Sequence, residues 1–438
     1  MPSSSRNGFR AWMLVSRVAW AVGIVAASLG PWHAGGLNAR SNAAPSPVAR
    51  TPWLAPSPLD DQSLDEGEVP APLEAEGISQ IHPSLSPSPF ENINLTSGNL
   101  ALIIPLLHLP GNGLIDLDVM LSLNTKHWEW RIGPGVVLEG APEGPKVISA
   151  DGTPHTLVGV GTNDPMSPEF WRYQVVTHLL QKPNGVTVQY GRCDATTRAC
   201  LPLQESDPFG NVISYEYNDG PSGPRLASIT QALEGDRHRQ VNFTYDPQSG
   251  LLQTMTYGTA TWTLEWTDSR NLHRVILATH GAWVFDRTPL GFQEDQLTVT
   301  TPTGGVIQYQ TVGLVSGWSD GQRGGNSHPL FRRYVASRTT MGPQLAPGTW
   351  TFQYYTPGEA FVNTARYLQD PDGTNTTYTV DYDSGFALSR TVVPSGQTEP
   401  IETESIDWAD VEWMYVNIPL VHAKSTMRDG FTYRTEYT

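Results

Sequence analysis

The sequence predicts an all-β protein, an antiparallel β-hairpin array that forms a curled sheet or a partial β-shell. Three observations lead to this fold class. Gly and Pro, which form turns, number 41 and 36 of 438 residues, and 14 Trp, 16 Tyr and 12 Phe favour strands. Several segments alternate apolar and polar residues with the period of two that a strand requires. A Pro-Gly turn followed by a tyrosine at a fixed distance recurs along the chain.

The net charge excludes two classes of partner. Lys and Arg number 27 and Asp and Glu number 43, which gives a formal charge of −16 at pH 7. A protein this negative gains no counterion release on a phosphate backbone and is repelled by anionic lipids. We therefore expect neither nucleic acid nor an acidic membrane surface as a partner.

The first 90 residues are expected to lie outside the folded part. Residues 1–43 have the pattern of a signal peptide, with arginines before the apolar stretch 18–29 and a candidate cleavage site at Ser41-Asn-Ala43. An uncleaved anchor is the alternative. Residues 44–90 combine frequent prolines with acidic residues, which predicts a disordered linker. The mature protein is expected to be secreted or at the cell surface, with no membrane span after cleavage.

An N-terminal β-region is expected over residues 91–180. Leu100–Pro105 is a short apolar segment, Asn112-Gly113 is a turn dipeptide, and residues 115–123 alternate apolar and polar side chains. Together these features predict a hairpin with one buried face.

Residues 181–438 are expected to form a degenerate repeat region with the unit Pro-x-Gly-x-x-x-x-Tyr. Pro sets φ at the first corner of a turn, Gly accepts a positive φ, and the odd offset places the tyrosine on a fixed face of the outgoing strand. The four copies join Gly185 to Tyr190, Gly210 to Tyr215, Gly304 to Tyr309 and Gly373 to Tyr378. A register specified this tightly predicts that the tyrosines share one buried face.

Several copies share further residues. Asp207-Pro-Phe-Gly-Asn-Val precedes Tyr215 and Tyr217, Asp370-Pro-Asp-Gly precedes Tyr378, and Val241-Asn-Phe-Thr-Tyr-Asp246 precedes Gly250. The region also opens with Leu95-Thr-Ser-Gly-Asn-Leu100. On these motifs, residues 95–438 resemble the rearrangement-hotspot (RHS) and tyrosine–aspartate (YD) repeat proteins.

The resemblance implies a fold and a role. Repeats of this family form long strands that spiral into a hollow shell, which in many members encloses a C-terminal toxin or effector, while other members act at cell surfaces. It also favours bacterial export. The chain has few recognisable repeats and ends at Thr438 within a strand-like run. We therefore expect the N-terminal part of such a shell, truncated and open at its C-terminal edge, with an effector or a further repeat segment as partner.

No pattern of residues predicts catalysis, a cofactor or a metal ion, so the protein is expected not to be an enzyme. Gly317-Trp-Ser-Asp-Gly321 matches G-x-S-x-G, but a nucleophile elbow requires a following helix and a Gly-rich loop follows Ser319 instead. The histidines show no metal-ligand spacing.

The two cysteines, Cys193 and Cys200, enclose a short polar loop. In an oxidising compartment they can form a disulfide, and the alternative is two unrelated small residues in a loop.

Two functions from different classes follow. The first is a non-catalytic exported β-scaffold that encloses or displays an effector or mediates surface contacts. The second is a secreted carbohydrate-binding or carbohydrate-active protein, in which Trp408 and Trp413, beside late acidic residues, contact cell-surface carbohydrate. Cross-strand packing is the alternative for these tryptophans.

Overall fold

The computed structural model describes Ile78 and residues 82–437. Short gaps fall at 127, 141–144, 160–162, 168, 195–197, 221–222, 234–236, 270, 292–293, 317–329, 343–344, 355–363, 382–384 and 414–415. The described residues form 29 strands and no helix, which confirms the predicted all-β fold. Among them there is accordingly no helix long and apolar enough to cross a membrane. They all belong to one compact unit, Leu64–Thr438. The predicted signal peptide and most of the predicted linker lie outside the described residues.

A first, five-stranded antiparallel sheet forms from the N-terminal part of this unit. In spatial order it contains β1 (Ser84–Leu85), β2 (Glu91–Asn94), β3 (Leu100–Leu109), β4 (Leu117–Asn124) and β5 (Glu129–Ile132). Strands β3 and β4 form the hairpin predicted around Asn112-Gly113. The ladder shifts register after Pro105, which has no N–H to donate.

The predicted linker extends too far along the chain. Ser84 and Leu85 of β1 pair with Asn94 and Ile93 of β2, so the folded part begins before residue 91. Two residues are too few to show a period of two, and the surrounding prolines conceal the strand from sequence reasoning.

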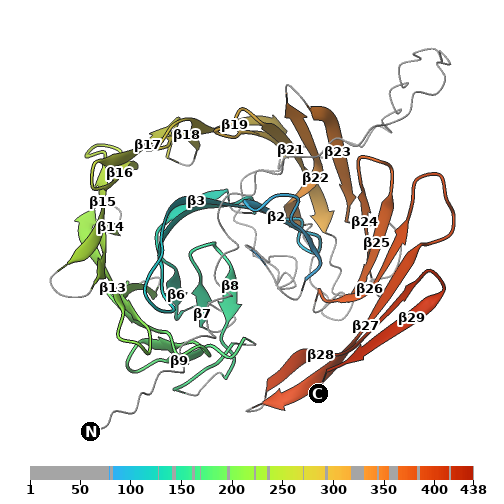
Figure 1. Ribbon diagram of the computed structural model, residues 1–438, viewed down its shortest axis with the longest axis horizontal. Helices are drawn as coiled ribbons and strands as arrows, with labels where there is room; N and C mark the ends of the chain where they lie inside the picture. Colours follow the sequence, from blue (N-terminus) through green and yellow to red (C-terminus); the bar gives the residue numbers. More distant parts are fainter. Residues whose placement is uncertain are drawn as a thin grey trace, which may run out of the picture. The chain divides into compact units, whose positions relative to one another are not determined.

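A second, long sheet contains strands that each pair antiparallel with the next along the chain (Figure 1). The strands are β9 (Arg172–Gln174), β10 (Leu179–Gln181), β11 (Thr187–Gly191), β12 (Ala199–Ser206), β13 (Val212–Gly220), β14 (Gly223–Ala232), β15 (His238–Tyr245), β16 (Leu252–Tyr257), β17 (Ala260–Trp266), β18 (Leu272–Ile276), β19 (Ala282–Gly291), β20 (Glu294–Thr300), β21 (Val306–Ser316), β22 (Leu330–Gly342), β23 (Leu345–Gln353), β24 (Thr364–Gln369), β25 (Asn375–Val380), β26 (Ala387–Val393), β27 (Glu402–Trp413), β28 (Val416–Arg428) and β29 (Phe431–Glu436).

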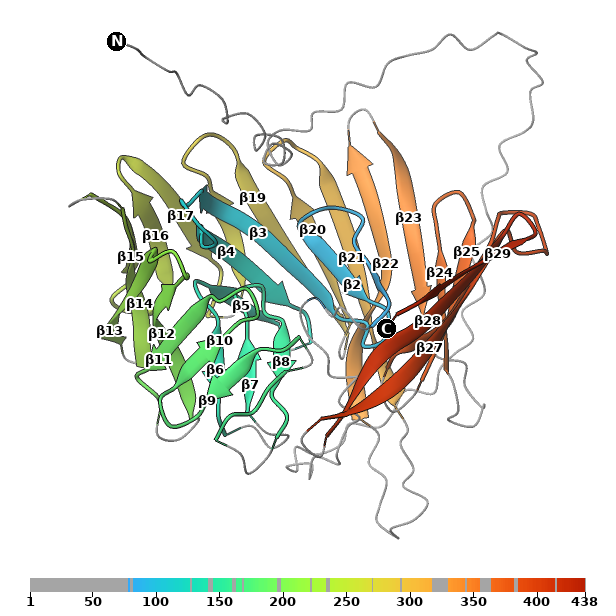
Figure 2. The same ribbon diagram turned by 60° about the horizontal axis from the view of Figure 1, so that its bottom comes forward.

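Three short strands join the two predicted β-regions. They are β6 (Val136–Leu138), β7 (Lys146–Ile148) and β8 (Pro154–Thr156), and Figure 2 shows them beside β9–β12. Val137 of β6 pairs with Cys200 of β12, and Met166 forms bridges to both Val158 and Arg172. The predicted boundary at residue 180 therefore does not separate two structural units.

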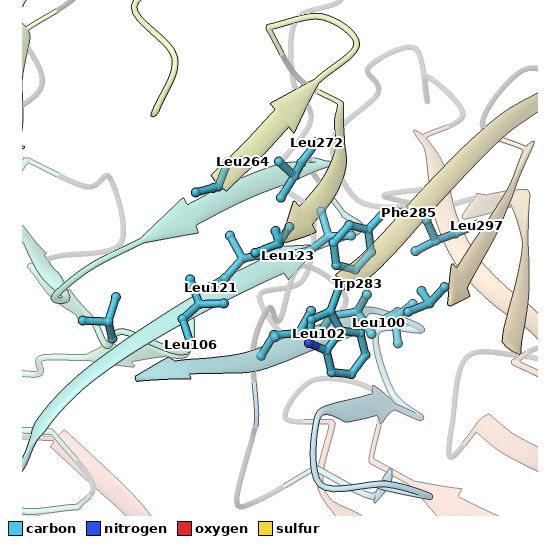
Figure 3. Close-up of a cluster of buried hydrophobic side chains, with 14 of the residues drawn as sticks. Leu100, Leu102, Leu106, Leu121, Leu123, Leu264, Leu272, Trp283, Phe285 and Leu297 are labelled. Carbon is cyan, nitrogen blue, oxygen red and sulfur yellow. The ribbon is translucent and has the colours of Figure 1, made fainter. Parts of the chain in front are cut away.

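The main hydrophobic core lies between the first sheet and one face of the long sheet. Leucines of β3 and β4, such as Leu102 and Leu121, contact Trp283, Phe285 and other side chains from β17–β20 (Figure 3). Burying one such side chain fully is worth about 1.5–3 kcal/mol. Apolar contacts thus hold the first sheet against one face of the long sheet. This is the face on which the repeat tyrosines were predicted to be buried.

Candidate functional site

All four Pro-x-Gly turns have the same backbone geometry. Their glycines have positive φ, at +84° for Gly185, +85° for Gly210, +84° for Gly304 and +87° for Gly373. Each glycine N–H donates to the carbonyl three residues earlier, and the N–H of that earlier residue donates to the carbonyl after the glycine. This is a three-residue hairpin loop, a type I turn followed by a left-handed residue. Pro at the first corner and Gly at the left-handed position are the residues that this loop favours.

The strand registers place the four tyrosines on one face of the long sheet. Tyr309 and Tyr190 are buried, with 0% and 4% of their surface exposed. Tyr215 and Tyr378 are half-buried and pack against the main core. Burial raises the pKa of all four phenols, so each is neutral at physiological pH.

A second turn motif was missed in the sequence. Asn94, Asp246 and Asp381 each accept, at their carbonyl, a hydrogen bond from the glycine four residues later, and these glycines have positive φ. The segments Asn94-Leu-Thr-Ser-Gly98, Asp246-Pro-Gln-Ser-Gly250 and Asp381-Tyr-Asp-Ser-Gly385 share the pattern Asn/Asp-x-x-Ser-Gly. Comparing the chain with itself for this pattern would have found it.

Aromatic residues at β-bulges form a further repeated feature. The registers shift at Tyr217, Tyr245, Trp266 and Trp408. Each of these side chains donates a hydrogen bond of 2.8–3.0 Å back to a carbonyl of the strand before its own. The bulge bends the strand and aims the ring at that carbonyl.

This series gives Trp408 a place in the fold. Its indole N–H donates to the carbonyl of Ala387, and its ring stacks on Phe386 at 4.6 Å between centroids. Trp413 lies in β27, but its side chain is outside the described residues. Ser319 also lies outside the described residues.

A buried ion pair connects the first sheet to the long sheet. The guanidinium of Arg338 on β22 donates to both carboxylate oxygens of Glu91 on β2, at 2.8 and 2.5 Å. Tyr309 donates its hydroxyl to the same carboxylate. Burial lowers the pKa of Arg338, but the hydrogen bonds and charge of Glu91 raise it overall, so the guanidinium stays charged.

A second buried charge cluster lies around Trp128. Asp295 pairs with Arg287 and Arg333, each at 2.8 Å. Both guanidinium groups lie over the Trp128 ring, 4.0 and 5.1 Å from its centroid. The turn after β4 is thereby attached to β19, β20 and β22.

Asp207 of the repeat motif connects a turn of the long sheet to the first hairpin. Its carboxylate accepts hydrogen bonds from the N–H groups of Leu114, Phe209 and Asn211 and from the Asn211 side chain, at 2.8–3.0 Å. Burial alone would raise the pKa of Asp207, but these hydrogen bonds hold it below its ordinary value. In contrast, burial and the nearby Asp372 raise the pKa of Asp370, the equivalent residue of the last copy.

Cys193 and Cys200 form a disulfide. Their sulfurs lie within 4.8 Å of a ring nitrogen of His178, but a disulfide offers no thiolate to a metal ion. The His178 ring is instead 2.7 Å from the carboxylate of Glu139, which also accepts the hydroxyl hydrogen of Tyr173 at 2.6 Å.

A cavity of about 270 Å³ lies where the first sheet, the short strands and β10–β14 meet. Its wall contains two of the repeat tyrosines, Tyr190 and Tyr215. The remaining wall is mostly apolar, and its charged residues are Asp116, Asp118, Lys182 and Glu205.

The face that is apolar over β13–β22 becomes charged over the last strands. Arg390 on β26 pairs with Glu402 on β27, and Glu404 pairs with Lys424 on β28 at 2.8 Å. The registers place these residues on the same face as Tyr378. The last described strand, β29, pairs with β28, and its six residues are all exposed.

Comparisons with known proteins give distant structural matches. No protein-family model and no curated protein matches the chain. A Photorhabdus luminescens Tc holotoxin pore matches 79% of this chain at 9% identity, with a TM-score of 0.34. The TcdB2-TccC3 structure matches 78% at 10% identity, with a TM-score of 0.22. The chain spans 17% and 21% of the lengths of those chains.

Proposed function

We propose that this chain is a non-catalytic exported β-scaffold that holds another polypeptide, either an effector that it encloses or displays or a further repeat segment. The resemblance of its turn motifs to RHS and YD repeats supports this role. The observation that carries the proposal is the exposed strand β29, which pairs with β28 along one edge.

The second edge of β29 offers backbone groups to a partner strand. Tyr437 donates its N–H to the carbonyl of His422, so odd-numbered residues of this strand direct their backbone groups toward β28. Thr432, Arg434 and Glu436 therefore direct theirs away from β28. An exposed edge of this kind is a template for pairing with another chain.

Apolar side chains accompany this edge. Phe431, Tyr433 and Tyr437 lie on one face of the strand and are 66%, 63% and 51% exposed. Aromatic side chains supply much of the binding energy of protein interfaces. A strand added beside β29 would pair with its backbone and cover these rings, which is β-augmentation.

The test is co-expression of the chain with the product of the neighbouring coding sequence, followed by affinity purification. Arg434→Pro removes an N–H that faces away from β28, whereas Arg434→Ala keeps it. We expect the partner to co-purify with the wild type and with Arg434→Ala but not with Arg434→Pro. Equal recovery with all three chains, or a chain that light scattering shows to be monomeric and partnerless, would refute the proposal.

A further inference from the structure

Glu205 is a carboxylate in an otherwise apolar row. The registers pair it with Val188 on β11 and with Ile213 on β13, so its side chain lies on the core face of the long sheet and lines the cavity. Its side chain is 20% exposed. A partly buried carboxylate is costly unless hydrogen bonds compensate it.

The contacts of Glu205 leave part of its hydrogen-bonding capacity unused. The ammonium of Lys182 and the hydroxyl of Tyr215 each lie 3.3 Å from one of its oxygens. These are long hydrogen bonds, and a carboxylate can accept about four. The carboxylate can therefore accept a further donor from within the cavity.

Tyr190 adds a hydroxyl without a hydrogen bond, on a side chain that is otherwise almost fully buried. Its side chain lines the cavity, is 4% exposed, and its hydroxyl bonds to none of the described residues. Its cross-strand neighbour Pro202 has no N–H, and the Pro202 carbonyl already accepts a hydrogen bond from Tyr217. Because this hydroxyl is unpaired and its side chain lines the cavity, it is a contact point for a ligand bound there.

The charged residues that line the cavity determine which charge a ligand should carry. Asp116, Asp118 and Glu205 supply three carboxylates against the single ammonium of Lys182. This balance repels an anion and attracts a cation. The faces of the Tyr190 and Tyr215 rings also favour a cation, through their negative electrostatic potential.

We propose that this cavity binds a small organic cation, namely a primary amine with an apolar body. The ammonium donates to Glu205 and to the Tyr190 hydroxyl oxygen, and the body packs against Val188, Ile213 and the other apolar residues of the wall. No sequence motif marks this site, because its residues come from strands whose proximity depends on the whole fold.

Three probes of nearly equal shape test the proposal. The full-length chain is titrated by calorimetry at pH 7 and low salt with benzylamine, which is protonated, with neutral benzyl alcohol and with anionic benzoate. We expect saturable binding of benzylamine, binding of the alcohol about tenfold weaker, which is 1.4 kcal/mol, and none of benzoate. No saturable binding of benzylamine, or equal affinity for all three probes, would overturn the proposal.

Variants then locate the site. Glu205→Gln keeps the shape and removes the charge, and should weaken benzylamine about tenfold or more, as expected for a lost charged hydrogen-bond partner. Tyr190→Phe keeps the ring and should weaken benzylamine binding several-fold. Glu399 is exposed, and Glu399→Gln should leave benzylamine binding unchanged. Circular dichroism shows whether each variant is folded. Unchanged binding by folded Glu205→Gln and Tyr190→Phe chains would place the amine elsewhere and reject the site.

Discussion

Replacing Arg338 by methionine should weaken the contact between the two sheets. Arg338 and Glu91 are almost fully buried, with 3% and 0% of their side chains exposed. Without the guanidinium, the Glu91 carboxylate keeps the hydroxyls of Ser88 and Tyr309 as its side-chain donors among the described residues, and no positive charge. Leaving one partner of a buried pair uncompensated costs about 3–5 kcal/mol, a large fraction of the stability of a typical domain.

Urea unfolding, followed by circular dichroism and by tryptophan fluorescence, measures this loss. Arg434→Met is the matched control, because Arg434 forms an exposed ion pair with Glu436 in which both side chains are about half exposed. Exposed pairs contribute little, so this control should unfold with the wild type.

A double variant separates charge from packing. Glu91→Leu with Arg338→Met leaves no unpaired charge at this contact and should lose less stability than the two single changes added together. An Arg338→Met chain as stable as Arg434→Met, or strict additivity in the double variant, would refute the view that this pair fastens the first sheet.

Three further predictions concern the turn and bulge motifs. Gly210→Ala should lower the free energy of unfolding by about 1–2 kcal/mol. Because φ is +85° and an added Cβ would meet no atom within 4 Å, the loss comes only from the backbone conformation. Gly210→Asn should lose less stability in the same urea series, and equal losses for the two variants would contradict this cause. Tyr217→Phe should cost about 1 kcal/mol through the lost hydrogen bond to Pro202, and an unchanged unfolding curve would show that this bond contributes nothing. The pKa of Asp207 is lowered from 3.8, so its stabilisation is complete above about pH 4 and is lost as the pH falls through the folded-state value. Asp207→Asn should therefore flatten the acid side of the plot of melting temperature against pH, and parallel plots for the two chains would contradict it.

Local rules explain why the turns and strands could be predicted. Pro208 and Gly210 determine their loop through their own φ preferences, with no help from distant residues. The offset of five then places Tyr215 on a definite face, since side chains alternate along a strand. The same reasoning holds for the β3–β4 hairpin and needed no knowledge of the remaining chain.

The contacts between the sheets could not be predicted in this way. Glu91 and Arg338 are 247 positions apart, and nothing in either local segment indicates the other. Nothing in the sequence distinguishes Glu205 from other polar residues of a strand. It lines a cavity only because the first sheet and the short strands meet there. Trp408 lies at a bulge like that of Tyr217, and nothing in the sequence around it marks this position.

The ion pair between β2 and β22 can form only late in synthesis, because its two residues lie far apart in the sequence. At about 5–20 residues per second, a ribosome needs roughly 12–50 s to add the 247 residues that separate Glu91 from its partner. For most of this interval the leucines of β3 and β4 are uncovered, because the side chains of β17–β20 that pack on them, such as Trp283 and Phe285, are made late in it. The nascent chain therefore carries an exposed, aggregation-prone hairpin. Its yield in cells should depend on a chaperone that binds this hairpin until β17–β20 have been made.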